Sequence, residues 1–298
     1  MQKFITLLSF SFLLHSASAQ YQQLDSLQGH RTKIYFSKGA NSRANYLAGL
    51  MDKAYQYYNK LLNFSPDVEL LVLSVKDWKT YTNMPVVGMP HYDNSNNKKL
   101  VVASEDNPLW RSLVPPMELL DSATAGRVKA VYTMDDETLS MARFFDLLAL
   151  HELAHAYHMQ AGIKMQRQWM SELFVNMMLH NFVAEKMPEL LPALTVFPTM
   201  VVGQGSASFQ FKRLQDIEEK YTEIGSRHPK NYGWFQCRWH MAAGEIYDKA
   251  GAKAGVKLWK ILRRMTSKLD DQALSSLLKN KVHPSVAAVM DDWDANTR

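Results

Sequence analysis

The chain has 298 residues, of which 47% are hydrophobic and 21% are charged, a balance that excludes intrinsic disorder and suffices for a sizeable core. This length fits one large domain or two closely packed lobes. The formal net charge of +5 comes from scattered basic residues, so the sequence does not indicate a nucleic-acid partner. Cys237 is the single cysteine, which excludes an internal disulfide.

Residues 1–19 have the three parts of a secretory signal peptide. Lys3 supplies the positive charge, residues 4–14 form the apolar segment, and the tripeptide that ends at Ala19 matches the small-residue cleavage site. We therefore predict an exported protein, periplasmic or secreted, that is cleaved after Ala19. No later apolar run approaches the roughly 20 residues of a membrane span, so no membrane anchor is predicted in the mature chain.

Residues 20–165 are predicted to form a mixed α/β lobe with a small sheet. Short apolar runs predict strands, and an apolar pattern of helical spacing predicts an amphipathic helix between them. A stretch rich in Asn, Ser, Gly and Pro, residues 88–97, is typical of a surface hairpin or loop. The predicted strands are Thr32–Phe36, Val68–Val75 and Lys98–Ala103, and the predicted helix is Asn45–Leu62.

A predicted helix at Phe144–Met159 carries the pattern H-E-x-x-H. His151 and His155 are four residues apart, so both imidazoles project from one helix face and can bind a single metal ion, for which zinc is expected. Glu152 is turned about 100° from His151 around the helix axis. Its carboxylate is therefore predicted beside the metal, as the general base for an activated water. Leu150 and other apolar residues already supply a core-facing surface, which argues against histidines that merely fill the core.

A catalytic zinc site needs a third protein ligand, and Glu172 is the best candidate. It lies beyond Gly162, a helix-stop signal, in a second run of helical periodicity at Gln168–Lys186. A short connection makes the two helices antiparallel neighbours, so the second can return its first turn to the histidines. His158 is a rival, but one helix cannot easily wrap three ligands around a tetrahedral ion. We therefore predict one zinc ion per chain, bound by the two histidines of the motif and Glu172.

Residues 166–298 are predicted to form an all-α lobe that carries the third ligand. The apolar spacing stays helical almost to the end of the chain, with ordinary turn residues between the segments. The overall prediction is an α+β fold, with an α/β lobe, a central helix that bears the metal ligands, and a helical lobe. The further predicted helices are Pro188–Met200, Phe209–Ile224, Trp234–Ala250, Ala252–Lys268 and Pro284–Trp293.

The motif His-Glu-Leu-Ala-His at 151–155, followed by Trp-Met-Ser-Glu-Leu-Phe at 169–174, resembles the gluzincins, zinc peptidases that include thermolysin-like and aminopeptidase-N-like enzymes. The Trp-x-x-Glu-x-Phe wording is closer to the aminopeptidase-N side. The resemblance implies a thermolysin-like metallopeptidase catalytic domain with its substrate cleft between two lobes. The metzincin pattern is excluded because it needs Gly and His where this chain has His158 and Ala161.

The resemblance also implies that a sheet edge beside the zinc helix binds the substrate backbone as an added strand. Lys98–Ser104 is the candidate for this edge, and an ordinary strand without a substrate role is the alternative. The aminopeptidase branch carries a Gly-Ala-Met-Glu-Asn motif on that strand, whose glutamate holds the free amine of the substrate. This motif is absent from the chain, where residues 88–90, Gly-Met-Pro, are only faintly similar to it, so the choice between endopeptidase and exopeptidase action stays open.

A zinc peptidase also needs a hydrogen-bond donor for the oxyanion of its tetrahedral intermediate. Tyr232, at the head of a predicted helix, resembles the catalytic tyrosine of aminopeptidase-N-like enzymes in position, although Phe235 replaces the glycine of the usual Tyr-x-x-Gly. His228 and His240 are the alternatives on the thermolysin-like analogy. Asn176 is a candidate acceptor for the ring N–H of a zinc-binding histidine, or else an amide on the helix surface.

These features predict a zinc-dependent metallopeptidase that acts on a peptide or protein substrate. Two alternatives stay open. The first is a catalytically silent exported binding protein on the same scaffold, which the retention of Glu152 argues against. The second is a zinc hydrolase of non-peptide amides or esters, which the sequence does not separate from a peptidase.

Overall fold

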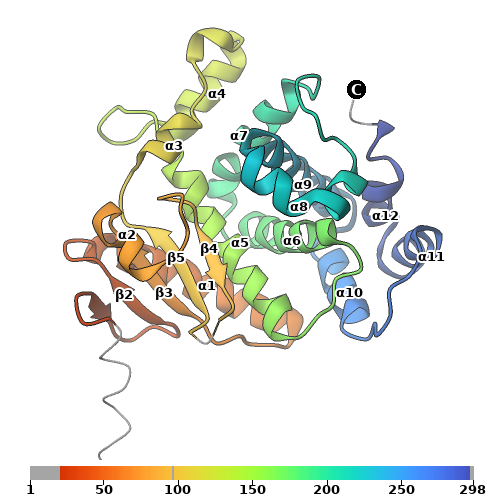
Figure 1. Ribbon diagram of the computed structural model, residues 1–298, viewed down its shortest axis with the longest axis horizontal. Helices are drawn as coiled ribbons and strands as arrows, with labels where there is room; N and C mark the ends of the chain where they lie inside the picture. Colours follow the sequence, from red (N-terminus) through yellow and green to blue (C-terminus); the bar gives the residue numbers. More distant parts are fainter. Residues whose placement is uncertain (1–20, 96, 296–298) are drawn as a thin grey trace, which may run out of the picture.

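A computed structural model describes residues 21–95 and 97–295, and the signal segment predicted at 1–19 lies outside these residues. The described residues form a mixed α+β fold, as predicted, with a small sheet and a larger helical part (Figure 1). The strands are β1 (Asp25–Leu27), β2 (Lys33–Phe36), β3 (Glu69–Leu73), β4 (His91–Asp93) and β5 (Lys99–Ala103). The helices are α1 (Asn41–Leu62), α2 (Val75–Tyr81), α3 (Pro108–Ser112), α4 (Ser122–Tyr132), α5 (Ala142–Gln160), α6 (Gln168–Lys186), α7 (Leu191–Gly203), α8 (Leu214–Arg227), α9 (Pro229–Ala250), α10 (Lys253–Leu262), α11 (Asp271–Leu277) and α12 (Pro284–Asp291). Short 3-10 segments at Met117–Leu119 and Pro188–Leu190 and a π-helical segment at Leu278–Val282 complete the regular structure.

The sheet has the strand order β1-β2-β3-β5-β4. The inner strands β2, β3 and β5 are parallel, and the two outer strands are antiparallel to their neighbours. β3 and β5 are apolar along almost their whole length, which is typical of parallel strands that are covered on both faces. α1 provides the crossover between β2 and β3, because parallel strands cannot be joined by a tight turn.

The edge strand beside the motif helix is β4, and the prediction that Lys98–Ser104 forms this edge is therefore wrong. β5 lies inside the sheet between β3 and β4. The three residues of β4 are too few to show a strand periodicity, and they stand inside the turn-rich stretch 88–97. The prediction for that stretch was a hairpin or loop, and the structure has a hairpin: β4 pairs antiparallel with β5 through a short connection in which Lys98 has a φ of 48°.

The motif helix α5 and the first long helix α1 lie together on the sheet. α1 contacts β2 and β3, whereas α5 contacts β4 and β5, and the two helices contact each other. α5 ends just before Gly162, whose φ of 67° suits glycine, so the predicted stop signal is confirmed. The following helix α6 has the predicted bounds, Gln168–Lys186. The motif helix therefore stands between the edge strand and the helical part.

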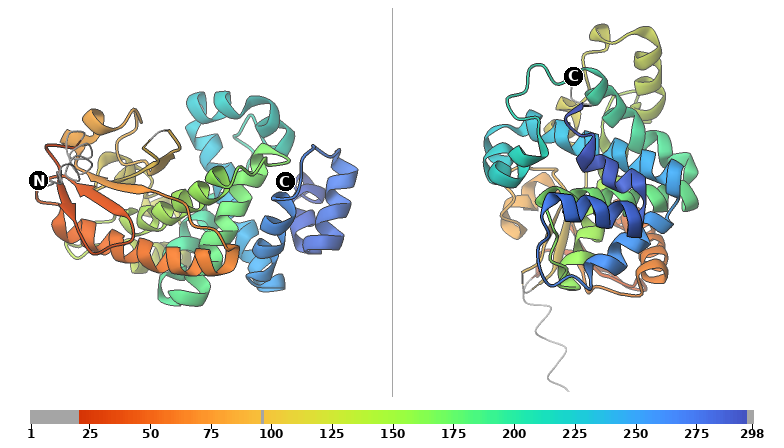
Figure 2. Two further views of the ribbon diagram at one scale, coloured as in Figure 1. Left: turned by 90° about the horizontal axis from the view of Figure 1, so that it is seen from below. Right: turned by 90° about the vertical axis from the view of Figure 1, so that its right-hand side faces the viewer.

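α6 occupies the centre of the helical part, where it contacts α5, α8 and α9. The left view of Figure 2 shows the sheet toward one end of the molecule and the C-terminal helices toward the other. Every long predicted helix has a counterpart, and the ends of all but α6 are shifted. For example, α9 begins earlier than predicted, at Pro229, because proline is well suited to the first helical position. The short helices α2, α3, α4 and α11 were not predicted.

One hydrophobic core runs through both parts of the described chain. Trp259, on α10, donates its indole N–H to the carbonyl oxygen of Leu62, at the end of α1, across 3.0 Å. This bond joins the helical part to the sheet-covering helix in a buried position. Among the described residues, no helix is long and apolar enough to cross a membrane.

Candidate metal centre

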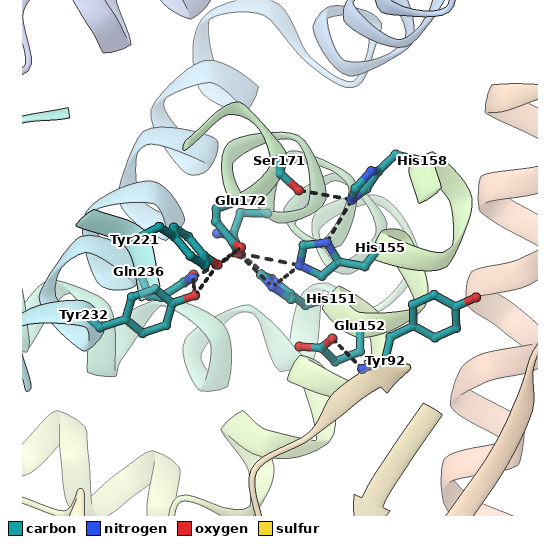
Figure 3. A network of polar contacts seen from close by, with 11 residues as sticks. Tyr92, His151, Glu152, His155, His158, Ser171, Glu172, Tyr221, Tyr232 and Gln236 are labelled. Carbon is teal, nitrogen blue, oxygen red and sulfur yellow. Dashed lines mark hydrogen bonds and ion pairs between the residues drawn. The ribbon is translucent and has the colours of Figure 1, made fainter. Parts of the chain in front are cut away.

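Two histidines of α5 and one glutamate of α6 form a buried group that could hold a metal ion (Figure 3). The Nε2 atoms of His151 and His155 are 3.2 Å apart. Oε2 of Glu172 lies 3.4 Å from the first and 3.6 Å from the second. Ligand atoms of a tetrahedral ion with bonds of 2.0–2.1 Å are about 3.3 Å apart, so the three atoms have the spacing of three corners of such a site. The structure thus brings together the three predicted ligands.

The N-terminus of α6, which carries Glu172 in its second turn, is fixed by a residue from another helix. Arg167, at the capping position, provides no side-chain acceptor of its own. Instead, Oε1 of Glu218 on α8 accepts hydrogen bonds from the backbone N–H groups of Gln168 and, at 3.3 Å, Trp169. A carboxylate at this end satisfies free N–H groups and interacts favourably with the helix dipole. Helix α8 therefore helps to position α6.

Asn176 lies behind His151, where the sequence placed one possible role for it. Its Oδ1 is 2.9 Å from Nδ1 of the imidazole, and the side chain is fully buried. An amide oxygen can only accept, so Nδ1 donates and Nε2 keeps a free lone pair. That lone pair faces Glu172. His151 is thus held in the tautomer that a metal ligand requires.

His158 backs His155 in the same way and is not one of the three clustered ligands. Its Nε2 is 2.9 Å from Nδ1 of His155 and 3.1 Å from Oγ of Ser171. Burial, with the neighbouring His155, lowers the pKa of His158 to about 3. A neutral His158 can accept the Nδ1–H of His155 through Nε2, which leaves Nε2 of His155 free to face Glu172.

The charges of the ligand group are complementary. Burial alone would raise the pKa of the Glu172 carboxyl, but His155 and His151 outweigh it and hold that pKa well below its usual range. Burial would lower the pKa of His155, yet the charge of Glu172 raises it above the ordinary value. Glu172 is thus ionised at neutral pH, as a carboxylate ligand must be.

Glu152 lies beside the ligand group, toward the sheet. Its side chain is partly exposed, and its Oε2 accepts the backbone N–H of Tyr92 in β4 across 3.0 Å. Figure 3 shows this carboxylate between the histidines and the edge strand. The predicted base is therefore not a member of the ligand triangle, and it has access to solvent.

Tyr232, on α9, reaches the centre through two residues that the sequence did not reveal. Its hydroxyl is 2.9 Å from the hydroxyl of Tyr221 and accepts from Nε2 of Gln236 at 2.8 Å. Tyr221 donates to Oε1 of Glu172 and Gln236 donates to Oε2, each across 2.9 Å. Gln236 could have been suspected, because it lies one turn after Tyr232 on the same helix face. No sequence signal marks Tyr221.

The two histidines considered as alternatives to Tyr232 have different surroundings. His228 joins α8 to α9 with a non-helical backbone (φ −128°, ψ 57°), and its ring packs against Phe211 at 5.2 Å between centroids. No contact described for His228 reaches the ligand group, so the structure does not bring it to the centre. His240 is buried beside His151, with ring centroids 6.0 Å apart, and burial with His151 and His180 lowers its pKa well below the usual range.

Comparison with known proteins does not name this centre. A scan against protein-family models matches no family, and a search of the curated proteins finds no match.

Proposed function

We propose that this chain is an exported zinc metallopeptidase with a gluzincin-type centre on a thermolysin-like fold. The observation that carries the proposal is the ligand triangle of His151, His155 and Glu172, with edges of 3.2, 3.4 and 3.6 Å. The order of parts also supports it: a sheet with an edge beside the motif helix, then the motif helix, then a helical part that supplies the third ligand.

The donor set fits zinc better than the hard cations. Two imidazole nitrogens and one carboxylate oxygen are usual zinc ligands, whereas magnesium and calcium prefer oxygen ligands alone. Three protein ligands leave a fourth position for water or substrate. When bound, zinc would supply Lewis acidity, which polarises a carbonyl group and lowers the pKa of water to about 7.

The residues around this position transfer protons, stabilise the oxyanion and orient the ligands. Glu152 takes a proton from the attacking water as the water oxygen bonds to the carbonyl carbon. It then returns this proton to the amine nitrogen as the C–N bond breaks. Burial and the charge of Glu172 raise the pKa of Tyr232, so its phenol keeps the proton that an oxyanion donor needs. Asn176 and His158 keep the two ligand imidazoles oriented.

The free edge of β4 is the proposed place for the substrate backbone. Tyr92 pairs with Leu100 of β5, but its N–H points away from β5 and toward Glu152. An extended peptide added along this edge would pass directly beside the base and the ligand group. This assignment replaces the edge that the sequence had suggested on β5.

The substitution Glu152→Gln tests the proposal. The variant should keep zinc and fold, because Glu152 is not in the ligand triangle, but lose nearly all hydrolysis, because an amide cannot take the proton. Cleavage of a mixed peptide library and metal content are measured for the wild type, Glu152→Gln and the exposed control Glu118→Gln. Full activity in Glu152→Gln would remove Glu152 as the base.

The same assay separates the alternatives. Zinc-containing wild type that hydrolyses esters or non-peptide amides but no peptide would be a different zinc hydrolase. Zinc-containing wild type without any hydrolysis would indicate a binding protein. If wild-type protein produced in the presence of zinc contains none, the proposed metal centre is overturned.

Export rests on the signal segment of the sequence alone. We expect the protein outside the cytoplasm with an N-terminus at Gln20. N-terminal sequencing of protein from fractionated cells tests this, and an intact N-terminus in the cytoplasm would contradict it.

A further inference from the structure

Glu172 closes a ring of hydrogen bonds with three side chains from α8 and α9. The ring runs from Glu172 to Gln236, then to Tyr232, then to Tyr221, and back to Glu172 (Figure 3). Its four bonds are all 2.8–2.9 Å long. Both carboxylate oxygens take part, and both bonds to them come from outside the helix that carries Glu172.

Counting hydrogens fixes the direction of every bond in the ring. An ionised carboxylate only accepts, so Tyr221 gives its one proton to Oε1, and Gln236 must turn its amide nitrogen toward Oε2. The second amide hydrogen goes to the oxygen of Tyr232. Because the Tyr221 proton is already used, Tyr232 donates its own proton to the oxygen of Tyr221. Every hydrogen of the three side-chain groups is therefore committed within the ring, so Tyr232 donates to an oxyanion only by turning its proton away from Tyr221.

The ring makes the two oxygens of Glu172 unequal. Oε1 is held by Tyr221, whereas Oε2 faces both imidazoles and receives only Gln236 from the ring. We propose that Tyr221 and Gln236 are positioning residues that hold Glu172 as a zinc ligand through Oε2 alone. This inference rests on the zinc centre proposed above but not on peptide hydrolysis.

The backbone supports this role for Tyr221. α8 is broken at Lys220, where φ is −132° and ψ is 24°, and Tyr221 follows directly. Two residues before the break, Glu218 caps the N-terminus of α6. α8 therefore holds α6 at two points, one at its N-terminus and one at the ligand side chain itself.

Tyr232 holds a different position in the ring. It contacts Tyr221 and Gln236 but has no bond of its own to Glu172. Replacing it would leave both bonds to the carboxylate in place, so its loss should affect zinc affinity far less than the loss of either neighbour. Loss of Tyr221 or Gln236 should thus weaken zinc binding, whereas loss of Tyr232 should have little effect on it. General damage to the fold would not produce this difference.

The test compares zinc dissociation constants, obtained by competition with a chromophoric chelator, for Tyr221→Phe, Gln236→Met and Tyr232→Phe. Tyr57→Phe removes a phenol–carboxylate bond to Glu185, and Gln215→Met removes an amide–carboxylate bond to Glu219, so these are matched controls away from the centre. We expect affinity to fall about tenfold or more in Tyr221→Phe and Gln236→Met, with less than about threefold change in the other three.

Two further measurements separate positioning from stability. Thermal unfolding of the metal-free proteins should give similar midpoints for all three ring variants. The visible spectrum of cobalt(II) bound in place of zinc should change in Tyr221→Phe and Gln236→Met, because a freed Glu172 changes its coordination.

The outcomes distinguish this inference from the proposed function. If the wild type binds zinc and both positioning variants match it in affinity and cobalt spectrum, the ring has no role in ligand positioning. Equal weakening by Tyr232→Phe would also overturn the assigned positions. If Tyr221→Phe and Gln236→Met bind zinc more weakly in a protein that cleaves no peptide, the result would support the inference and refute the proposed peptidase function. A wild type that binds no zinc would overturn both.

Discussion

Tyr232 is the residue whose proposed chemical role can be separated most clearly from substrate binding. Its pKa is raised by burial and by Glu172, so the phenol stays protonated and can donate to an oxyanion. Such a donor acts mainly when charge develops in the transition state. We expect Tyr232→Phe to lower kcat and kcat/KM together by about a hundredfold, with KM little changed, in steady-state peptide hydrolysis.

The control for this prediction is His240→Ala, because His240 lies beside His151 and is the remaining alternative donor. The phenyl ring of Tyr232→Phe keeps the packing, so the metal-free variant should unfold at the wild-type temperature. Near-normal turnover in Tyr232→Phe together with a crippled His240→Ala would transfer the donor role to His240.

At the residue scale, the sequence revealed what lies on one helix and little of what approaches from elsewhere. The four-residue spacing of His151 and His155 fixes a shared face, and Asn176 follows Glu172 by one turn, so local periodicity was enough for these residues. Tyr221 reaches Glu172 only because α8 is packed against α6 and broken at Lys220. No periodicity within α8 encodes that contact.

At the element scale, the motif helix is tied to α1 by an ion pair whose carboxylate is buried. The two terminal guanidinium nitrogens of Arg43, Nη1 and Nη2, donate to the carboxylate of Asp146, whose side chain is 6% exposed. Burial raises the pKa of Asp146, and Arg43 opposes that effect. Arg43→Met should therefore lower the free energy of unfolding by about 3–5 kcal/mol, because it leaves a buried carboxylate unpaired.

Denaturant titration measures this loss, and two variants control it. Lys33 pairs with Glu69 at 3.5 Å but is 64% exposed, so Lys33→Met should change stability by no more than about 1 kcal/mol. The double variant Arg43→Met/Asp146→Leu should recover most of the loss, because no charge remains buried. If Arg43→Met and Lys33→Met lower the free energy of unfolding by a similar small amount, the pair of Arg43 and Asp146 contributes no more than an exposed ion pair.

The elements themselves were predictable where the apolar residues form a clear pattern. α6 has its predicted bounds because a long apolar periodicity leaves one choice. β4 was missed because three half-buried residues contain no usable pattern, and its place at the edge depends on pairing with β5. The sheet order thus came from tertiary contacts, and the proposed substrate edge changed with it.

At the scale of the whole molecule, the candidate metal centre lies where the two parts of the chain meet. His151 and His155 belong to the helix that covers the sheet, whereas Glu172 belongs to the core of the helical part. An ion bound to all three would connect α5 to α6 in addition to the apolar core that already joins them. Zinc is thus expected to add to the stability of an already folded chain.

This coupling predicts a stability gain that depends on zinc concentration. A ligand that binds only the native state adds about 2.7 kcal/mol to the free energy of unfolding at a hundred times its dissociation constant. We expect the wild type to show this gain in denaturant titration at buffered free zinc, and a chelator to reverse it while the protein stays folded. The double variant His151→Ala/His155→Ala should unfold at the same denaturant concentration with and without zinc, since Glu172 alone cannot hold the ion. An equal gain in the wild type and the double variant would mean that zinc binds elsewhere, because removing both histidines abolishes the stabilisation by zinc only if these histidines bind it.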